Sequence, residues 1–538
     1  MKRSYRIVAF VMVGLIGMSA TIIKNDKLFE ITKNLEIFAT TYQLLNTKYV
    51  DELDPSELMK IGIDAMVNSL DPYTVYYSES QIESYRLADE GKYQGMGAII
   101  NKVGDYITVM EIYEDGPAME AGLQSGDQIV EVNGLDTRGR STEEMNAISK
   151  GVPGTDVNLK VKRLTSSSLI DITLTRGAHS IPNVPYSGRV ADNIGYISLT
   201  TFTENASGNI INALQELKSD EELDGVILDL RYNGGGLLRE AIAISNIFID
   251  QGKEVVTTKG KIKEEDQTFN TMRPAIDLEI PIVVLTNKRS ASASEIVSGV
   301  LQDYDRGVIM GQRTFGKGLV QNTQEVGYNS RVKLTTSKYY IPSRRCIQAV
   351  EYDNGEPVDI PDSQRSQFKT ANGRVVLDGG GVTPDVRLPE IVQSEFTESL
   401  MKNNIIFQYV NKYVSEHEEV AAPGDFVFDE YNDFISFVQS NGYEFESEIE
   451  KELKEGSKDI SSKLQLEFEN LLAKINADQD DDLNEFKNQI IKEIELDIIS
   501  RYYYQSGKAK HKLNGDSEIQ EAISLLNDQD RYNKILGN

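Results

Sequence analysis

Three serines before a predicted helix are the first residues whose position suggests chemistry. The stretch 287–297 follows an apolar, strand-like run and leads into a helical pattern, and it contains Ser290, Ser292 and Ser294. A serine at such a turn exposes its hydroxyl at the edge of a sheet, where the first N–H groups of the helix face a developing oxyanion. The same residues also fit helix capping, because Ser292 and Glu295 have the spacing of a capping box.

Lysine is the side chain that remains as a general base for a serine. The histidines are only His179, His417 and His511, and their scatter argues against a Ser-His-Asp triad. Burial lowers the pKa of a lysine by disfavouring its charged form, and a neutral amine can accept a hydroxyl proton. Lys317 lies 25 residues after Ser292, and a neighbouring amide such as Gln321 can orient its amine without restoring the charge.

The segment around this lysine has a second interpretation. Residues 311–317 have the Gly-x-x-x-x-Gly-Lys spacing of a phosphate-binding loop. However, Gly318 stands where such a loop carries a magnesium-binding Ser or Thr, and Leu319 and Val320 continue as a strand instead of a helix. Both departures argue against nucleotide binding.

Three consecutive glycines, Gly234, Gly235 and Gly236, follow another apolar strand-like run and precede a helical pattern. Glycine lets the backbone approach a ligand closely, so these N–H groups can serve as oxyanion donors. As an isolated motif, the segment is equally compatible with a tight connection between a strand and a helix.

Composition limits the class of protein. The 538 residues exceed what one hydrophobic core usually serves, and 40% hydrophobic with 26% charged residues is ordinary for a globular chain. A net charge of −28 disfavours nucleic acid as a partner. The single cysteine, Cys346, excludes an intrachain disulfide and a cysteine-rich metal cluster, and we expect neither a metal nor an organic cofactor.

The amino terminus has the pattern of an export signal. Lys2, Arg3 and Arg6 precede the uncharged run 7–23, and Lys24 ends it. The run is short for a membrane-spanning helix but sufficient if flanking lysines reach the interface, so a cleaved signal and a retained anchor both stay open. We expect an exported, periplasmic protein that is either released or anchored to the inner membrane through this run.

Beyond residues 1–24, the chain divides into four predicted regions of a multidomain α+β and α/β protein. Residues 25–90 are helical, and their apolar stripe favours a core face over a contact between two chains in a homo-oligomer. Residues 91–177 show short β-type runs, and residues 178–395 alternate strands with helices. Residues 396–538 are helical and acidic, with 30 acidic against 15 basic residues. The acidic run 478–482 lacks the alternating ligands and central glycine of a calcium loop.

The β-rich module resembles a PDZ domain. The resemblance is carried by the segment from Asp115 to Gly134, DGPAMEAGLQSGDQIVEVNG. Gly95, Met96, Gly97 and Ala98 then occupy the place of the PDZ carboxylate-binding loop. In that family, successive N–H groups of the loop hold the terminal carboxylate of a peptide, and the following strand pairs with the peptide.

Taken in order, the motifs from about residue 28 to 389 resemble the C-terminal processing peptidases, or tail-specific proteases, a family of Ser-Lys serine peptidases. The resemblance implies that Ser292 is the nucleophile, Lys317 the general base and Gln321 its orienting partner. It also implies that the N–H groups of Gly236 and Ala293 form the oxyanion hole, and that the substrates are proteins or peptides with a free C-terminus. One departure is visible, because Gly234 stands where relatives often carry proline. The alternative is a catalytically idle PDZ-containing scaffold or adaptor.

Overall fold

The computed structural model describes residues 27–81, 92–142, 144–145, 154–220, 222–349, 352–353, 356–358, 360–456, 464, 467–468, 470–472, 474 and 482–538. The expected export signal and almost all of the acidic run 478–482 lie outside these residues. The chain divides into two units, of which one comprises Met1–Ile82 with Gln321–Thr335 and the other Glu83–Val320 with Thr336–Asn538. Within the described residues, no helix is long and apolar enough to cross a bilayer.

The smaller unit is mainly helical. Residues 27–48 form a helix, and a second helix, α2 (Pro55–Asn68), begins where the Asp54 carboxylate accepts the N–H groups of the first turn. The strand β1 (Val75–Tyr77) pairs antiparallel with β18 (Ser330–Tyr340). The apolar stripe of the first helix, predicted mainly as a core face, is instead exposed in this chain, with Leu28, Phe29, Ile31, Leu35 and Phe38 each at least 40% accessible.

The predicted PDZ-like module forms a β-sheet of order β3-β4-β5-β7-β8, with β6 paired to β5. Its strands are β3 (Ala98–Val103), β4 (Tyr106–Ile112), β5 (Gln128–Val132), β6 (Leu135–Asp136), β7 (Asp156–Lys162) and β8 (Ile170–Thr175), with the short helix α4 (Pro117–Glu120). The strands β2 (Lys92–Gly95) and β9 (Gly177–Ser180) form a separate pair. Because β3 pairs only with β4 among the described strands, it is an edge strand of this sheet.

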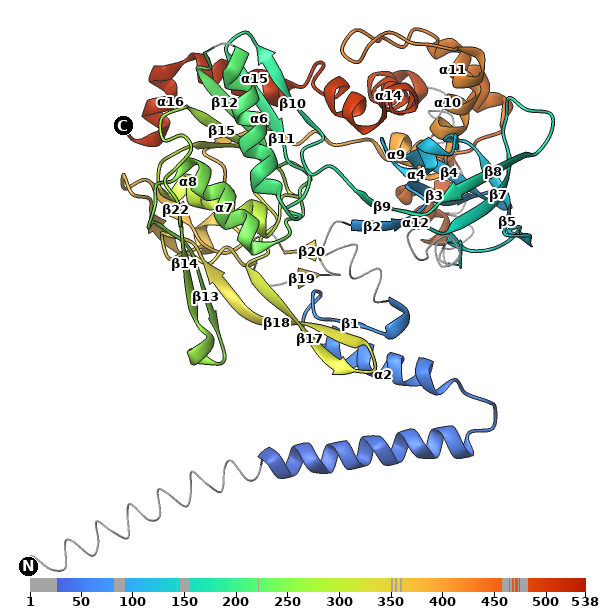
Figure 1. Cartoon of the computed structure of the whole chain (residues 1–538), viewed down its shortest axis with the longest axis horizontal. Coiled ribbons are helices and arrows are strands. Elements are labelled where there is room, and N and C mark those ends of the chain that lie inside the picture. Colours follow the sequence, from blue (N-terminus) through green and yellow to red (C-terminus); the bar gives the residue numbers. More distant parts are fainter. Residues whose placement is uncertain are drawn as a thin grey trace, which may run out of the picture. The chain divides into compact units, whose positions relative to one another are not determined.

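The α/β region contains a six-stranded sheet of order β10-β11-β12-β15-β16-β23 (Figure 1). All neighbours after the antiparallel pair β10–β11 are parallel. The strands are β10 (Tyr186–Ala191), β11 (Ile194–Ser198), β12 (Gly225–Asp229), β15 (Ile282–Thr286), β16 (Val308–Gly311) and β23 (Val386–Arg387). Every residue of β12, β15 and β16 is buried, which is why their sequences are continuous apolar runs and not alternating patterns.

Helices cover both faces of this sheet. One face packs on α6 (Ala206–Asp220), α7 (Leu238–Phe248) and α8 (Ala293–Asp303). The opposite face packs on the last two helices of the chain, α15 (Ser517–Asn527) and α16 (Gln529–Leu536). Alternate strand residues serve the two faces: Val284 contributes to the first core, whereas Val283 and Leu285 contribute to the second.

The remaining elements surround these domains. The polar segment 253–277 lies outside the six-stranded sheet and forms the hairpin β13 (Glu254–Gly260) and β14 (Gln267–Asn270), which joins β18 in another sheet. Shorter elements are η1 (Glu79–Gln81), η2 (Lys263–Glu265), η3 (Asp362–Gln364), β17 (Leu319–Gly327), β19 (Tyr352–Asp353), β20 (Glu356–Pro357), β21 (Gln367–Lys369) and β22 (Val375–Leu377).

The acidic region after residue 395 forms a separate helical core. Its aromatic-rich interior joins α9 (Glu395–Lys402), α10 (Ile405–Glu416), α11 (Tyr431–Ser440) and α14 (Lys487–His511), and α12 (Glu448–Gly456) lies in the same region of the sequence. The predicted fold class is therefore confirmed: a PDZ-type module, an α/β domain and a helical C-terminal region lie in one chain.

Candidate active site

Three loops meet at one edge of the six-stranded sheet. The strands β12, β15 and β16 are neighbours and parallel, so their carboxyl ends lie side by side. They are followed by the glycine segment 230–236, the serine segment 287–292 and the lysine segment 312–318, in that order. Ligands of open α/β sheets bind outside the carboxyl ends of the strands, which makes this edge the candidate site.

Ser292 stands at the sharp turn between β15 and α8. Its φ of 56° and ψ of −111° are unusual for a residue with a side chain, and such backbone strain is concentrated at functional sites. Ser290 stabilises the turn, because its hydroxyl accepts the Asn287 N–H at 2.9 Å and donates to the Leu230 carbonyl at 2.8 Å. Of the three candidate serines, Ser290 and Ser294 are fully buried, whereas Ser292 is partly exposed.

The glycine segment lies directly against Ser292. A Cβ atom on Gly235 would approach the Ala291 carbonyl to 2.7 Å, the Ser292 Cβ to 2.8 Å and the Ala293 nitrogen to 2.9 Å, so only glycine fits there. Gly235 also has a φ of 98°. The Ala291 N–H donates to the Asn233 carbonyl at 3.0 Å, which ties the two loops together.

Gly236 is held on the other side by Phe202. The Phe202 N–H donates to the Gly235 carbonyl at 3.0 Å, and the Phe202 carbonyl accepts the Leu237 N–H at 2.8 Å. Among the described residues, neither the Gly236 nor the Ala293 N–H donates to a backbone carbonyl outside regular helices and strands. The two predicted oxyanion donors therefore each follow one of the two residues, Gly235 and Ser292, at which the glycine and serine segments touch.

Glu295 joins the serine and lysine segments. It lies on the first turn of α8 and is fully buried. One carboxylate oxygen accepts the N–H groups of Ser292 and Lys317, both at 2.8 Å. The other accepts the Thr314 hydroxyl at 2.6 Å and the Gly316 N–H at 2.7 Å. Burial raises the pKa of Glu295 to about 7, against these four hydrogen bonds, which lower it.

Tyr339 makes a second link between the same two residues. Its hydroxyl lies 2.6 Å from the Lys317 carbonyl and 3.1 Å from the Ser292 carbonyl, so it can donate to either. The ring is 1% exposed and is carried by β18. The backbones of Ser292 and Lys317 are thus bound to one carboxylate oxygen and to one phenol oxygen, which brings the predicted nucleophile and base into the same site.

Lys317 is half-buried in the loop between β16 and β17. The chain continues after it as the strand β17 and not as a helix, in agreement with the argument against a phosphate-binding loop. Gln321, its predicted orienting partner, belongs to the smaller unit, where its side-chain amide donates to the Thr335 hydroxyl at 3.3 Å.

The predicted carboxylate-binding loop connects β2 to the edge strand β3. Gly95 ends β2 and Ala98 begins β3, with Met96 and Gly97 between them. Gly97 has a φ of 75°, and its carbonyl accepts the Tyr113 N–H at 3.0 Å. A loop that leads into an open strand edge is the arrangement to which a peptide C-terminus adds as a further strand.

Sequence reasoning missed two residues of the site. Glu295 was expected only as a helix cap, and its spacing from Ser292 was the one signal available. Tyr339 carried no signal, because it lies on a strand whose sequence shows no unusual pattern. The cap itself is also present, since the Glu295 carboxylate accepts the N–H of the residue that precedes the helix.

Four family models match the chain: Peptidase family S41 at residues 193–355, PDZ domain at 108–163, Probable PDZ-protease, C-terminal helical domain at 396–526, and Activating protease CtpB N-terminal domain at 17–81.

Curated proteins with similar sequences are named as proteases. A carboxy-terminal-processing protease of Bartonella bacilliformis is 34% identical over 344 residues, 63% of this chain and 78% of that protein. A probable CtpA-like serine protease of Staphylococcus aureus is 35% identical over 65% of this chain and 71% of its own length. The solved photosystem II D1 C-terminal processing protease is 25% identical, with a TM-score of 0.36, over 67% of this chain and 94% of that one. The chain belongs to the carboxy-terminal-processing serine proteases of peptidase family S41.

Proposed function

We propose that this protein is an endopeptidase that captures the C-terminus of a protein substrate at Gly95–Ala98 and cleaves it with Ser292 as nucleophile and Lys317 as general base. The observation that carries the proposal is the double link between these two residues, whose backbones are both bound to Glu295 and to Tyr339. A nucleophile and a base held by common partners are the minimum that covalent hydrolysis without imidazole needs.

The reaction follows from these roles. The neutral Lys317 amine takes the proton of the Ser292 hydroxyl, and the oxygen attacks the peptide carbonyl. The N–H groups of Gly236 and Ala293 bind the oxyanion of the tetrahedral intermediate. Lys317 then returns the proton to the leaving amine as the C–N bond breaks. Water, deprotonated by the same amine, hydrolyses the acyl-enzyme and frees the serine. No step needs a metal or an organic cofactor.

Gln321 is proposed to orient the Lys317 amine. The resemblance to the C-terminal processing peptidases supports this role, and Gln321 lies on the strand β17, four residues after Lys317. A neutral amide can bind the amine without restoring its charge.

Paired incubations test the assignment. Wild type, Ser292→Ala and Lys317→Ala are incubated with an unstructured peptide that has an apolar C-terminus, and the products are identified by mass spectrometry. Lys288→Ala is the matched lysine control, because Lys288 lies at the same edge but is 67% exposed and paired with Glu390. We expect products from wild type and the control alone. Complete cleavage by Lys317→Ala would refute the base, and absence of Ser292-dependent cleavage would favour the idle scaffold.

We further propose that the protein is exported and that residues 7–23 are either removed or retained as an inner-membrane anchor. The basic residues before this uncharged run support the proposal. Cell fractionation followed by N-terminal sequencing tests it: a start beyond residue 24 in the periplasmic fraction indicates cleavage, and recovery of the intact terminus with membranes indicates an anchor. Recovery of the intact chain in the cytoplasm would contradict export.

A homo-oligomer is proposed from the helix at residues 27–48. Its apolar side chains are exposed in the single chain, and a contiguous apolar face on a soluble domain usually marks an interaction surface. Sedimentation of the protein without residues 1–24 tests this proposal, with a double change of Leu35 and Phe38 to Ser as the comparison. A monomeric wild type would contradict it.

A further inference from the structure

The first turn of the second-last helix of the chain lies at the edge of the sheet that carries the candidate active site, although nothing in the sequence assigned this helix a role. The helices α15 and α16 cover one face of the six-stranded sheet. Helix α15 begins after Asp516, whose carboxylate accepts the N–H groups of Glu518 and Ile519 at 3.0 and 3.2 Å. Its first turn therefore carries two acidic side chains next to the carboxyl ends of the strands.

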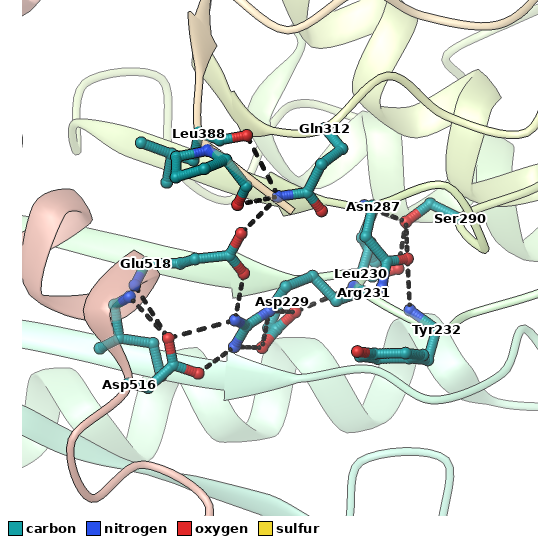
Figure 2. A network of polar contacts seen from close by, with 12 residues as sticks. Asp229, Leu230, Arg231, Tyr232, Asn287, Ser290, Gln312, Leu388, Asp516 and Glu518 are labelled. Atoms are coloured by element: carbon teal, nitrogen blue, oxygen red, sulfur yellow. Dashed lines mark hydrogen bonds and ion pairs between the residues drawn. The ribbon is translucent and has the colours of Figure 1, made fainter. Parts of the chain in front are cut away.

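These carboxylates surround Arg231, which is the second residue of the glycine segment that follows the strand β12. Figure 2 shows the guanidinium bound to Asp229 at 2.7 Å, to Asp516 at 2.9 Å and to Glu518 at 2.5 Å. All four side chains are at most 12% exposed. Burial alone lowers the pKa of Arg231, but the carboxylates, Asp229 first, raise it above its ordinary value, so the guanidinium stays charged.

Glu518 has a second partner on another catalytic segment. Its other carboxylate oxygen accepts the side-chain amide of Gln312 at 2.6 Å (Figure 2). Gln312 directly follows the strand β16, where its N–H donates to the Thr286 carbonyl at 2.9 Å. Arg231 lies five residues before Gly236, and Gln312 lies five residues before Lys317. One carboxylate thus joins the start of the glycine segment to the start of the lysine segment.

Stability does not account for this network. Three carboxylates around one guanidinium leave an excess of buried negative charge, and buried ion pairs are often no more stable than apolar residues of the same volume. What such a network supplies is a fixed geometry, since each charged partner holds the others in position. The two segments joined here must keep an oxyanion donor and a base in register to within a fraction of an ångström.

We propose that Glu518 is a positioning residue for catalysis, which holds the glycine segment through Arg231 and the lysine segment through Gln312, so that helix α15 is part of the catalytic unit. The inference rests on the proposed roles of Gly236 and Lys317. Glu518 does not touch the reacting atoms and acts only through its two partners.

The test compares Glu518→Gln with Glu521→Gln in the full chain. The first variant keeps the size of the side chain but removes the charge that binds Arg231. The second is a matched control on the same helix, because Glu521 forms a surface pair with Arg531 at 2.9 Å, with both side chains at least 36% exposed. Peptide cleavage is measured well below the thermal midpoint of each variant, and hydrogen exchange is followed in fragments that cover residues 229–237 and 312–318.

We expect Glu518→Gln to lower kcat about 10- to 100-fold with KM within about twofold of wild type, because misplaced groups slow chemistry more than binding. Both fragments should exchange faster in this variant and at the wild-type rate in Glu521→Gln. A wild-type kcat in Glu518→Gln, or an equal loss in the control, would overturn the inference.

The exchange measurement separates the two proposals. If the wild type shows no Ser292-dependent cleavage, the proposed function fails, and the inference is then judged by exchange alone. Unchanged exchange in both fragments of Glu518→Gln would overturn it, whether or not the wild type is active.

Discussion

Replacing Glu295 by alanine removes the one carboxylate that binds both Ser292 and Lys317. Four donors lose their acceptor: the N–H groups of Ser292, Gly316 and Lys317 and the hydroxyl of Thr314. A buried donor without a partner costs about 1–3 kcal/mol, and water admitted to the vacated space recovers part of this. We expect Glu295→Ala to lower the free energy of unfolding by about 4 kcal/mol, near the lower end of the four-donor sum.

The effect on activity should exceed what unfolding explains. Without the shared oxygen, the serine and lysine backbones are no longer fixed relative to one another, and a displacement of about 1 Å costs about 100-fold in rate. Glu295→Gln is the conservative rescue. If its amide oxygen faces Ser292 and Lys317 and its nitrogen donates to the Thr314 hydroxyl oxygen, the link is kept, while the Gly316 N–H and the proton of the Thr314 hydroxyl lose their acceptor. We expect kcat in this variant to recover to within about tenfold of wild type.

The chain supplies a matched control for the capping role alone. Glu450 is 1% exposed on the first turn of α12, and its carboxylate accepts the Ser447 N–H at 2.8 Å in the same Ser-x-x-Glu arrangement. Glu450→Ala should lose about 1 kcal/mol of stability and keep its kcat. Urea unfolding and peptide cleavage, measured on all three variants, decide the matter. A folded Glu295→Ala protein with wild-type kcat, or an equal loss of kcat in Glu450→Ala, would refute the reasoning.

Three further predictions concern the same site. Gly235→Ala should abolish cleavage, because its Cβ would lie within 2.9 Å of three atoms of residues 291–293. Gly234→Ala is the control and should retain most activity, because its Cβ would meet no atom within 4 Å. Equal activity in the two variants would contradict this prediction. Tyr339→Phe should lower kcat about tenfold with little change in KM, since it removes one of the two links between Ser292 and Lys317 but leaves the ring packed. An unchanged kcat would show that the Tyr339 hydroxyl does not hold the two residues in position. The third concerns pH. Because burial raises the pKa of Glu295 to about 7, the folded state binds a proton that the unfolded chain releases near pH 4.5, so stability falls by about 3 kcal/mol as pH rises from 4.5 to 7 and then levels. Between pH 4.5 and 7 the thermal midpoint of wild type should therefore fall relative to that of Glu295→Gln, whose side chain does not titrate. Parallel curves for the two proteins would contradict this prediction.

The sheet and its three loops could be predicted from sequence because the signals are local. The glycine and serine segments were each expected after an apolar, strand-like run, and the strands β12 (Gly225–Asp229) and β15 (Ile282–Thr286) precede them in the structure. Strands buried on both faces give continuous apolar runs, and glycine and serine mark the points where the chain leaves them. Parallel order then brings the three loops to one edge without further information.

The apolar stripe of the first helix shows where local signals end. Periodicity identifies a helix with one apolar face, and the helix at residues 27–48 is present. The same periodicity does not say what covers that face. In this chain its side chains, Phe29 and Leu35 among them, are exposed, although a core face was favoured. The covering surface is a property of the fold or of an assembly, and no residue within the helix encodes it.

Three glutamates also show that a local pattern does not determine which distant residues a side chain contacts. Glu295, Glu450 and Glu518 all lie on the first turn of a helix, two or three residues after a capping residue, where a negative charge is favoured by the helix dipole. From sequence the three are equivalent. In the structure, Glu450 binds the backbone of its own turn, whereas Glu295 reaches a segment about 20 residues away and Glu518 reaches Arg231 and Gln312, more than 200 residues away. The local cap therefore accounts for the residue type at all three positions, and burial does not separate them, because Glu450 is as buried as the other two. What separates Glu295 and Glu518 from Glu450 is their contact with the loops that follow the parallel strands, which only the fold determines.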